Sequence, residues 1–523
     1  MFKKILYSLA AVSLLATATS CNDWLDVKPN NEQITDDYWK SKEDVESVVM
    51  SGYYYMRSCV PTFIYWGELR GGTFYASSSN TAKIQDFNLT PSHSMVKYAT
   101  LYQVINAANS VIKYAPQVRD IDDTYYDAQM YSHMCEAYFM RAYCNLILLK
   151  NYKSFPLILE PYVDDNASFD IAKSSEEEIV AQIKQDVLTA LATGAAKSTY
   201  EEDWQTKGRA TKWALYALMA DVCLWSEDYE TCKEYCDKIL DANEAFRPVF
   251  MSNTVQWYEM FSEGNSNESI FELNWDYNKA QESNNFASLW STVPSSSTLR
   301  FTKVAIEKIR DEITDVLNGQ TNFEGRVGRM LLATCNAVNG NGAYAQSNDF
   351  YMWKYAGTEI QDVTGGIRVH NDANFILYRV SEIILDKALA ETMTGNIEEA
   401  FKLVNRIRVR AGLGNFDGIA DDDLGAISNI DEQTMLEEIL LQKQMEFMGE
   451  AKRWYDLLWF GRVANYRYRD SFVNEVLQGN ETTNQSWIRS VLMDPDAWYL
   501  PIPQDDIDHN RLLVQNPYYT TSK

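Results

Sequence analysis

The stretch MLEEILLQKQMEFMGEAKRWYDLLWFGR, residues 435–462, is the part of the sequence that decides the fold class. Apolar residues recur at helical spacing from Met435 to Phe447, and the same pattern resumes at Trp454. Gly449 lies between the two runs, and an isolated glycine near the end of a helical pattern commonly marks the helix terminus. The sequence therefore predicts two helices that meet at this glycine.

Four charged residues of this stretch, Glu446, Glu450, Arg453 and Asp456, follow one another three or four positions apart. That spacing places them on one helical face, beside bulky apolar side chains. Carboxylates and a guanidinium on one face favour an internal ion network. A catalytic acid pair is the alternative, but a chain with 73 acidic residues brings carboxylates to helical spacing by chance. We interpret the four residues as a structural ion network that fixes helix register.

The same stretch resembles the C-terminal signature of the SusD/RagB-like outer-membrane nutrient-binding lipoproteins. The signature runs Glu-Phe-x-Gly-Glu-x-x-Arg-Trp-Tyr-Asp-Leu, and the matching residues are Glu446, Phe447, Gly449, Glu450, Arg453, Trp454, Tyr455, Asp456 and Leu457. Trp459 stands where the family more often has a basic residue. The tail over 498–519, WYLPIPQDDIDHNRLLVQNPYY, is also similar to the closing run of the family, with Tyr518 in place of glycine.

The resemblance implies a mainly α fold, in which about four tetratricopeptide-repeat-like helical hairpins form a scaffold and a loop-rich, minor-β half holds the ligand site. It also implies a lipid-anchored protein on the surface of the outer membrane. Such a protein captures oligosaccharide and delivers it to a SusC-like TonB-dependent transporter. A peptide-capturing lid of the RagB type, a helical scaffold for surface enzymes that binds no ligand, and a surface hydrolase are the alternatives.

The N-terminus has the features of a lipoprotein signal peptide. Two lysines precede an apolar run, small residues follow, and then comes Cys21. The apolar run is too short to span a membrane, whereas acyl chains on Cys21 would attach the mature chain durably to the outer membrane. We therefore divide the chain into a signal peptide over 1–20, an N-terminal region over 21–250 and a C-terminal region over 251–523.

Two stretches share a helix–turn–helix pattern. Residues 210–240 predict a helix, a tight SEDY turn and a second helix, and residues 375–413 repeat this arrangement around TGNIEEA. Small residues such as Ala217 and Ala388 let paired helices pack closely. Hairpins of this kind bury their apolar faces only against neighbouring hairpins. The repetition favours a tetratricopeptide-like array over an unrelated helical bundle.

Length and composition limit the fold and the partners. A chain of 523 residues exceeds what a single compact core supports, so subdomains or a repeat array are expected. The net charge of −26 excludes nucleic acid as a partner, because phosphate binding needs a concentrated basic surface. Aromatic residues make up 13% of the chain, which is more than an ordinary core requires, so we expect some rings at the surface.

Two regions without helical periodicity combine aromatic rings with small polar residues. They cover 61–95 and most of 251–372, where only ESIFELNWDY, from 268 to 277, alternates like a strand. A Trp or Tyr face can stack on the apolar C–H face of a sugar while Asn and Arg side chains bind its hydroxyl rim. The candidate ligand-binding residues are Trp66, Arg70, Tyr75 and Asn80 in the first region, and Trp275, Tyr277 and Trp290 in the second. For each ring, a place in the core or in a partner interface is the alternative.

No motif of an enzyme or of a metal site occurs in the sequence. None of the four histidines pairs at ligand spacing, and HExxH, the P-loop and the GxSxG elbow are missing. We therefore expect no catalytic residue, no metal and no cofactor. Eight cysteines form no CxxC pair; Cys232 and Cys236 lie one helical turn apart, but buried free thiols are favoured over a bridge between them.

Overall fold

The computed structural model describes residues 38–163, 168–290, 298–317, 328–335, 350–358, 367–480 and 484–520. Cys21 and the predicted signal peptide lie outside the described residues, so the lipid anchor stays a prediction. The described chain is mainly helical, which confirms the predicted fold class. None of its described helices combines the length and the apolar character needed to cross a bilayer.

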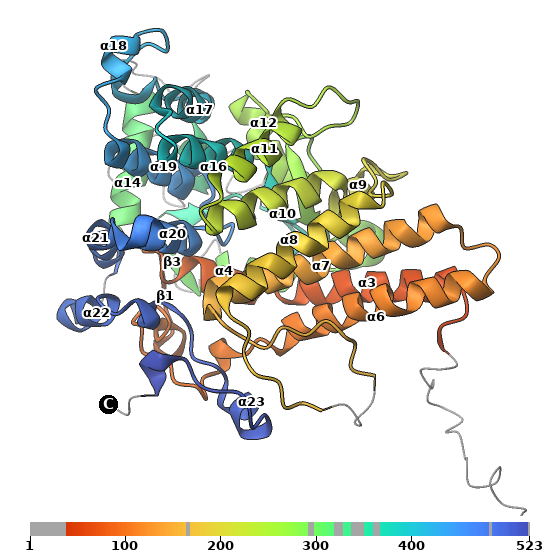
Figure 1. Ribbon diagram of the computed structural model, residues 1–523. Helices are drawn as coiled ribbons and strands as arrows, with labels where there is room; N and C mark the ends of the chain where they lie inside the picture. The colour runs from red at the N-terminus through yellow and green to blue at the C-terminus, as the bar shows by residue number, and fades with distance from the viewer. Residues whose placement is uncertain are drawn as a thin grey trace, which may run out of the picture.

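Long helices of the N-terminal half pack side by side (Figure 1). In order of contact they are α3 (Lys42–Ser58), α6 (Ala99–Ile121), α7 (Asp127–Tyr152) and α8 (Glu176–Ala192). A capping box opens α8, because the Ser175 hydroxyl accepts the Glu178 N–H at 3.2 Å and the Glu178 carboxylate accepts the Ser175 N–H at 2.8 Å. The second half of α7 is buried on nearly every side, so this helix lies at the centre of the layer.

The two predicted hairpins form the next part of the array. The first pairs α10 (Lys212–Trp225) with α11 (Tyr229–Leu240), and the second pairs α16 (Val380–Met393) with α17 (Ile397–Arg410). Their turns use left-handed backbone, with a φ of 59° at Glu227 and 81° at Gly395. Although they are distant in sequence, α11 and α16 pack against each other, so the regions before and after residue 250 share one array.

Three two-stranded antiparallel ladders hold the non-helical segments. They are β1 (Phe74–Ala76) with β3 (Leu299–Phe301), β2 (Ser269–Leu273) with β6 (Phe375–Arg379), and β4 (Thr334–Cys335) with β5 (Tyr351–Met352). The strand predicted over 268–277 is thus present in its first half. The ladders β1–β3 and β2–β6 join segments that are distant in sequence, and both strands of the second are buried along their whole length.

The remaining described helices are α4 (Val60–Glu68), α5 (Ser79–Ala82), α9 (Asp203–Gly208), α12 (Thr254–Ser262), α13 (Tyr277–Ala280), α14 (Lys303–Leu317), α15 (Arg329–Ala333), α18 (Leu424–Ile427), α19 (Glu432–Glu446), α20 (Arg453–Tyr466), α21 (Arg469–Gly479), α22 (Gln485–Leu492) and α23 (Gln504–His509). The prediction of one long loop over 61–95 is therefore wrong for its first part. Pro61 lies in the first turn of α4, where a missing N–H costs nothing, and Phe63 and Trp66 bury their side chains.

The described cysteines are free and buried; they are Cys59, Cys135, Cys144, Cys223, Cys232 and Cys236. This confirms the free-thiol interpretation for these six residues. Burial raises the pKa of the Cys59 thiol to about 12, as expected for a small side chain enclosed by apolar neighbours.

Candidate functional site

A groove with a volume of about 650 Å³ lies between α3, α6, the segments 156–163 and 168–171, and α23. These parts meet in the lower half of the molecule as drawn in Figure 1. The aromatic lining residues are Trp39, Tyr55, Tyr98, Tyr102, Tyr162 and Phe169, and the polar ones include Gln103, Asn106, Ser110, Asp506, His509 and Asn510. We call this surface the aromatic groove. Its size and its mostly apolar lining are typical of sites that bind small organic molecules.

Hydrogen bonds attach one wall of the aromatic groove to α6. The Tyr102 hydroxyl donates to the carbonyl of Pro156 at 2.8 Å. The Asn106 side chain donates to the carbonyl of Tyr162 at 3.2 Å and accepts its N–H at 2.7 Å. An irregular segment thereby has its main-chain groups paired, which fixes the wall relative to the helix.

The C-terminal tail forms the opposite wall of the aromatic groove. The Asn510 side chain donates to the carbonyl of Ile171 at 2.7 Å, and Arg511 forms an ion pair with Asp170. Both contacts join residues near α23 to the first wall. The two walls are therefore connected to each other as well as to the helical floor.

Ring faces are available in the aromatic groove. Tyr162 and Phe169 stack with centroids 5.1 Å apart and an interplanar angle of 15°, and the Phe169 side chain is 52% exposed. Trp39 stacks on Tyr114 at 4.9 Å. Such rings offer flat, apolar surfaces, while the neighbouring amides and hydroxyls offer hydrogen bonds at the rim. The arrangement suits a ligand that has an apolar face and a polar edge.

Asp506 is the only carboxylate among the described residues that line the aromatic groove. Burial raises its pKa, and a hydrogen bond with Tyr98 offsets this in part. Hydrolysis of a glycosidic bond by the usual mechanism needs two carboxylates that flank the bond. The lining therefore supports binding and provides no acid–base pair.

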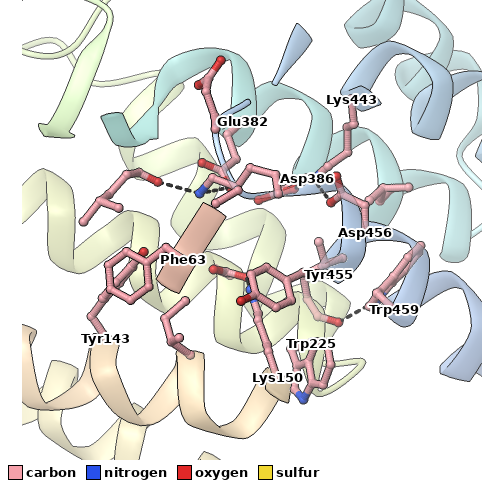
Figure 2. Close-up of a pocket in the computed structure, with 18 of the residues that line it drawn as sticks. Phe63, Tyr143, Lys150, Trp225, Glu382, Asp386, Lys443, Tyr455, Asp456 and Trp459 are labelled. Atoms are coloured by element: carbon pink, nitrogen blue, oxygen red, sulfur yellow. Dashed lines mark hydrogen bonds and ion pairs between the residues drawn. The ribbon is translucent and has the colours of Figure 1, made fainter. Parts of the chain in front are cut away.

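A second cavity, enclosed and with a volume of about 40 Å³, lies in the core (Figure 2). In Figure 2, Lys443 points toward Asp386 and Asp456. Its Nζ atom lies 2.5 Å from Oδ1 of Asp386 and 2.9 Å from Oδ1 of Asp456. On another side of the same cavity, Nζ of Lys150 lies 2.6 Å from Oδ1 of Asp221. The space fits water molecules and is far too small for a sugar ring. Its charged groups are paired, so we assign it a structural role.

The structure corrects the first set of candidate ligand-binding residues. Trp66 is fully buried and donates its indole N–H to the carbonyl of Met95 at 2.7 Å. Arg70 is 3% exposed, lies over the ring of Trp454 and donates to the carbonyl of Trp66 at 3.3 Å. The expectation that these two side chains face a ligand is therefore wrong, because neither has an open face.

Tyr75 and Asn80 lie nearer the surface. Tyr75 is half-buried on β1, and Asn80 is exposed on α5, where its side-chain oxygen lies 3.2 Å from Nε2 of His93. Both remain accessible to a ligand.

The second set divides in the same way. Trp275 and Trp290 are 8% and 3% exposed, so the expectation that they serve as surface platforms is also wrong. Trp275 packs beside Arg57, and Trp290 lies within the aromatic core. Tyr277 is half-buried and stacks on His370, with ring centroids 3.5 Å apart.

No cluster of His, Cys, Asp and Glu side chains in the described part of the chain has the arrangement of a metal site. The family model described as the SusD family matches residues 123–519. The chain belongs to the SusD family. Proteins of this family bind ligands without catalysing a reaction, so this chain is a non-catalytic binding protein.

Individual relatives of this SusD-family chain are distant. The SusD-like protein P38 of Formosa agariphila is 23% identical over 495 residues, which cover 87% of this chain and 91% of that protein. A SusD superfamily structure from Bacteroides thetaiotaomicron has a TM-score of 0.71 at 20% identity and covers 92% of this chain and 99% of its own. Surface glycan-binding protein A from Bacteroides uniformis has a TM-score of 0.68 at 16% identity, with coverages of 91% and 100%. These structures share the fold.

The signature of the SusD-family chain lies in its core. Glu446 is fully buried. Its carboxylate forms ion pairs with the guanidinium groups of Arg379 and Arg410, each with an N–O distance of 2.5 Å, and with that of Arg329 at 3.1 Å. Although burial alone would raise the pKa of Glu446, the three guanidinium groups hold it well below its usual range. The carboxylate is therefore ionised and joins three separate segments.

Of the other three signature residues, Glu450 shares Arg379 with Glu446, whereas Arg453 and Asp456 have separate partners. Glu450 binds Arg379 and Lys354, each at 2.8 Å. Arg453 instead binds Glu475 at 2.7 Å, and Asp456 binds Lys443. All four residues are buried and paired, but the prediction that they share one helical face is wrong, because α19 ends at Glu446, Glu450 lies in the turn and α20 begins at Arg453. Their ion-pair partners come from segments that the spacing does not reveal.

Sequence reasoning missed the aromatic groove of this SusD-family chain, because its lining comes from four separate parts of the sequence. One local signal is present in α6. Tyr98, Tyr102 and Asn106 are spaced by four residues, so they share one face of the helix. A face that repeats tyrosine and asparagine is unusual for helix packing and is compatible with a ligand site.

Proposed function

We propose that this protein is a cell-surface lipoprotein that binds an oligosaccharide and delivers it to a SusC-like TonB-dependent outer-membrane transporter. The aromatic groove is the proposed binding site. The observation that carries this proposal is the combination, in one groove of about 650 Å³, of stacked rings with amide and hydroxyl groups. The lipid anchor on Cys21 and the transporter partner follow from family membership and belong to the same proposal.

Sugar chemistry fits this lining. A pyranose ring has an apolar C–H face that stacks on Phe169 or Tyr55, and its hydroxyl groups match Gln103, Asn106 and the other polar side chains of the groove. Membership of the SusD family supports a glycan as the ligand. The shared fold of Surface glycan-binding protein A is consistent with it.

The experiment is calorimetric titration of the purified protein against a panel of neutral oligosaccharides. We expect Tyr55→Ala and Phe169→Ala to weaken binding by roughly 1 to 3 kcal/mol each without lowering the melting temperature. Tyr126→Ala is the matched control, because this ring is 68% exposed and lies outside the groove lining. Unchanged affinity in both groove variants refutes the groove as the site.

A second candidate surface is favoured by the stack between Tyr277, the first residue of α13, and His370, whose ring centroids lie 3.5 Å apart. Tyr75 and Asn80 are the other accessible members of the sequence-predicted set. If Tyr277→Ala weakens glycan binding while Phe169→Ala does not, the binding site lies here and the proposed function is kept with a different location.

Two other outcomes separate the alternatives. Binding of peptides with no glycan affinity identifies a lid of the RagB type. Absence of any small-ligand affinity, together with tolerance of all the ring substitutions, identifies a scaffold for surface enzymes. Each of these outcomes overturns oligosaccharide capture.

A further inference from the structure

A separate recess with a volume of about 550 Å³ lies between the end of α11, the segment 247–252 and α17. Its lining is unusual for a chain with a net charge of −26, because four of its side chains are cationic. The cationic members are Arg247, Lys402, Arg406 and Arg410, and the remainder are Leu240, Pro248, Val249, Phe250, Ser252, Val380, Asn405, Val409 and Asp421. We call this surface the cationic recess.

Two of the four cations are already neutralised. Arg410 is 2% exposed and binds Glu268 at 2.7 Å and Glu446 at 2.5 Å. Lys402 binds Glu398 at 2.5 Å one helical turn away. Their charges therefore contribute little to the field inside the recess.

Arg247 and Arg406 differ from them, since neither forms an ion pair or a side-chain hydrogen bond with any residue that the structure describes. The Arg406 guanidinium lies 5.3 Å from the ring centre of Phe250, which holds it over the recess. Partial burial lowers the pKa of Arg406, and Glu399 and Asp241 offset this only in part. A guanidinium at such a position gains from a bound anion.

The acidic residue of the lining is held by two amide groups, one of them from Asn405 of the same lining. Asp421 accepts hydrogen bonds from Asn405 at 2.7 Å and from Asn415 at 3.1 Å through the same oxygen. Exposed apolar side chains flank the cations, because Val249 is 44% and Val409 is 59% exposed. The recess thus offers two available guanidinium groups beside an apolar surface.

We propose that the cationic recess binds the anionic group of an acidic sugar, a uronate carboxylate or a sulfate ester, through Arg247 and Arg406. The sugar ring packs on Val249 and Val409, and the anion receives charge-assisted hydrogen bonds from the two guanidinium groups. Because the rest of the chain is strongly acidic, a long polyanion is repelled and a short ligand with one or two charges is favoured. This inference rests on the proposed glycan-binding function and adds a second site with its own ligand class.

The test is calorimetric titration of the full chain with a digalacturonate, a singly sulfated disaccharide and a neutral disaccharide. We expect one of the two anionic ligands to bind more tightly than the neutral one, and the better of the two identifies the anion. Arg406→Gln and Arg247→Gln should each weaken that binding about tenfold, whereas Arg406→Lys should retain part of it. Raising the salt concentration should weaken binding of the anionic ligand only.

Arg467→Gln is the matched control, because this side chain is 59% exposed and lines neither cavity. Melting temperatures of all variants verify that they fold. Equal affinity of wild type and Arg406→Gln for both anionic ligands overturns the inference. Loss of neutral-ligand binding in Arg406→Gln also overturns the inference, because the recess would then not distinguish charged ligands from neutral ones. If only the substitutions in the aromatic groove leave affinity unchanged, the groove is refuted as the binding site of the proposed function. The result for the cationic recess is not affected.

Discussion

Replacing Glu68 by glutamine should stabilise the protein, and the effect should grow with pH. Glu68 is fully buried at the end of α4, where one carboxylate oxygen accepts the N–H of Ala451 at 2.8 Å. The other oxygen has no hydrogen-bond partner among the described residues. Burial is the largest effect on the carboxyl group and raises its pKa from 4.5 to about 8, although Ala451 and Lys354 lower it in part.

The magnitude follows from this shift. A carboxyl group whose pKa is higher in the folded than in the unfolded state binds more protons when folded, so stability falls as pH rises between the two values. The loss is about 1.4 kcal/mol per pH unit, which gives about 4 kcal/mol by pH 8 for a change from 4.5 to about 8. Glutamine resembles the protonated acid, keeps an oxygen for Ala451 and does not ionise.

The assay is denaturant unfolding of wild type and Glu68→Gln at pH 5, 6, 7 and 8. Other titrating groups are common to both proteins, so they cancel in the difference between the two free energies of unfolding. We expect the two proteins to be nearly equal at pH 5 and the variant to be more stable by about 4 kcal/mol at pH 8. A difference that stays constant with pH, or a variant that is less stable at pH 8, refutes the reasoning.

The remaining predictions concern the core. Glu446→Gln should lower the free energy of unfolding by about 3 to 5 kcal/mol at pH 7, because Arg379 and Arg410 would lose a buried counter-charge. Denaturant unfolding of this variant checks the prediction, and an unchanged free energy of unfolding contradicts it. Trp66→Ala should cost about 3 to 5 kcal/mol by leaving a core cavity, while the folded fraction keeps its glycan affinity; a selective loss of affinity contradicts the buried position.

Local patterns predicted the helical part of the fold well. Helix α11 follows α10 after a short turn, and α17 follows α16 in the same way, so the periodicity and the turn residues of one short stretch contain the necessary information. The strand β2 was predicted from alternation. Its partner β6 was predicted as the start of the helix–turn–helix over 375–413, which is wrong for Phe375–Arg379, because strand pairing depends on which distant segment lies alongside. Helix α4 was missed because its residues were grouped with the small polar residues that follow them, and the whole of 61–95 was interpreted as lacking helical periodicity.

The candidate ligand residues show the limit of this approach. Trp290 stands among small polar residues in the sequence, and Trp66 lies near the start of a region that was interpreted as a loop, which suggests exposure, yet both are buried. Burial of a ring is decided by segments that pack over it, such as Tyr152 over Trp66, and that information is tertiary. Tyr277 kept an accessible position because it lies beyond the end of β2, where the chain leaves the core.

The position of the family match explains why membership leaves the ligand open. The match covers residues 123–519, whereas Trp39, Tyr55, Tyr98 and Tyr102 of the aromatic groove all precede it. The signature residues within it, such as Glu446, are buried and join helices to one another. The features that identify the SusD family therefore specify the scaffold. The rings that would contact a ligand lie largely outside them, so a relative that shares the scaffold at about 20% identity can carry a different groove.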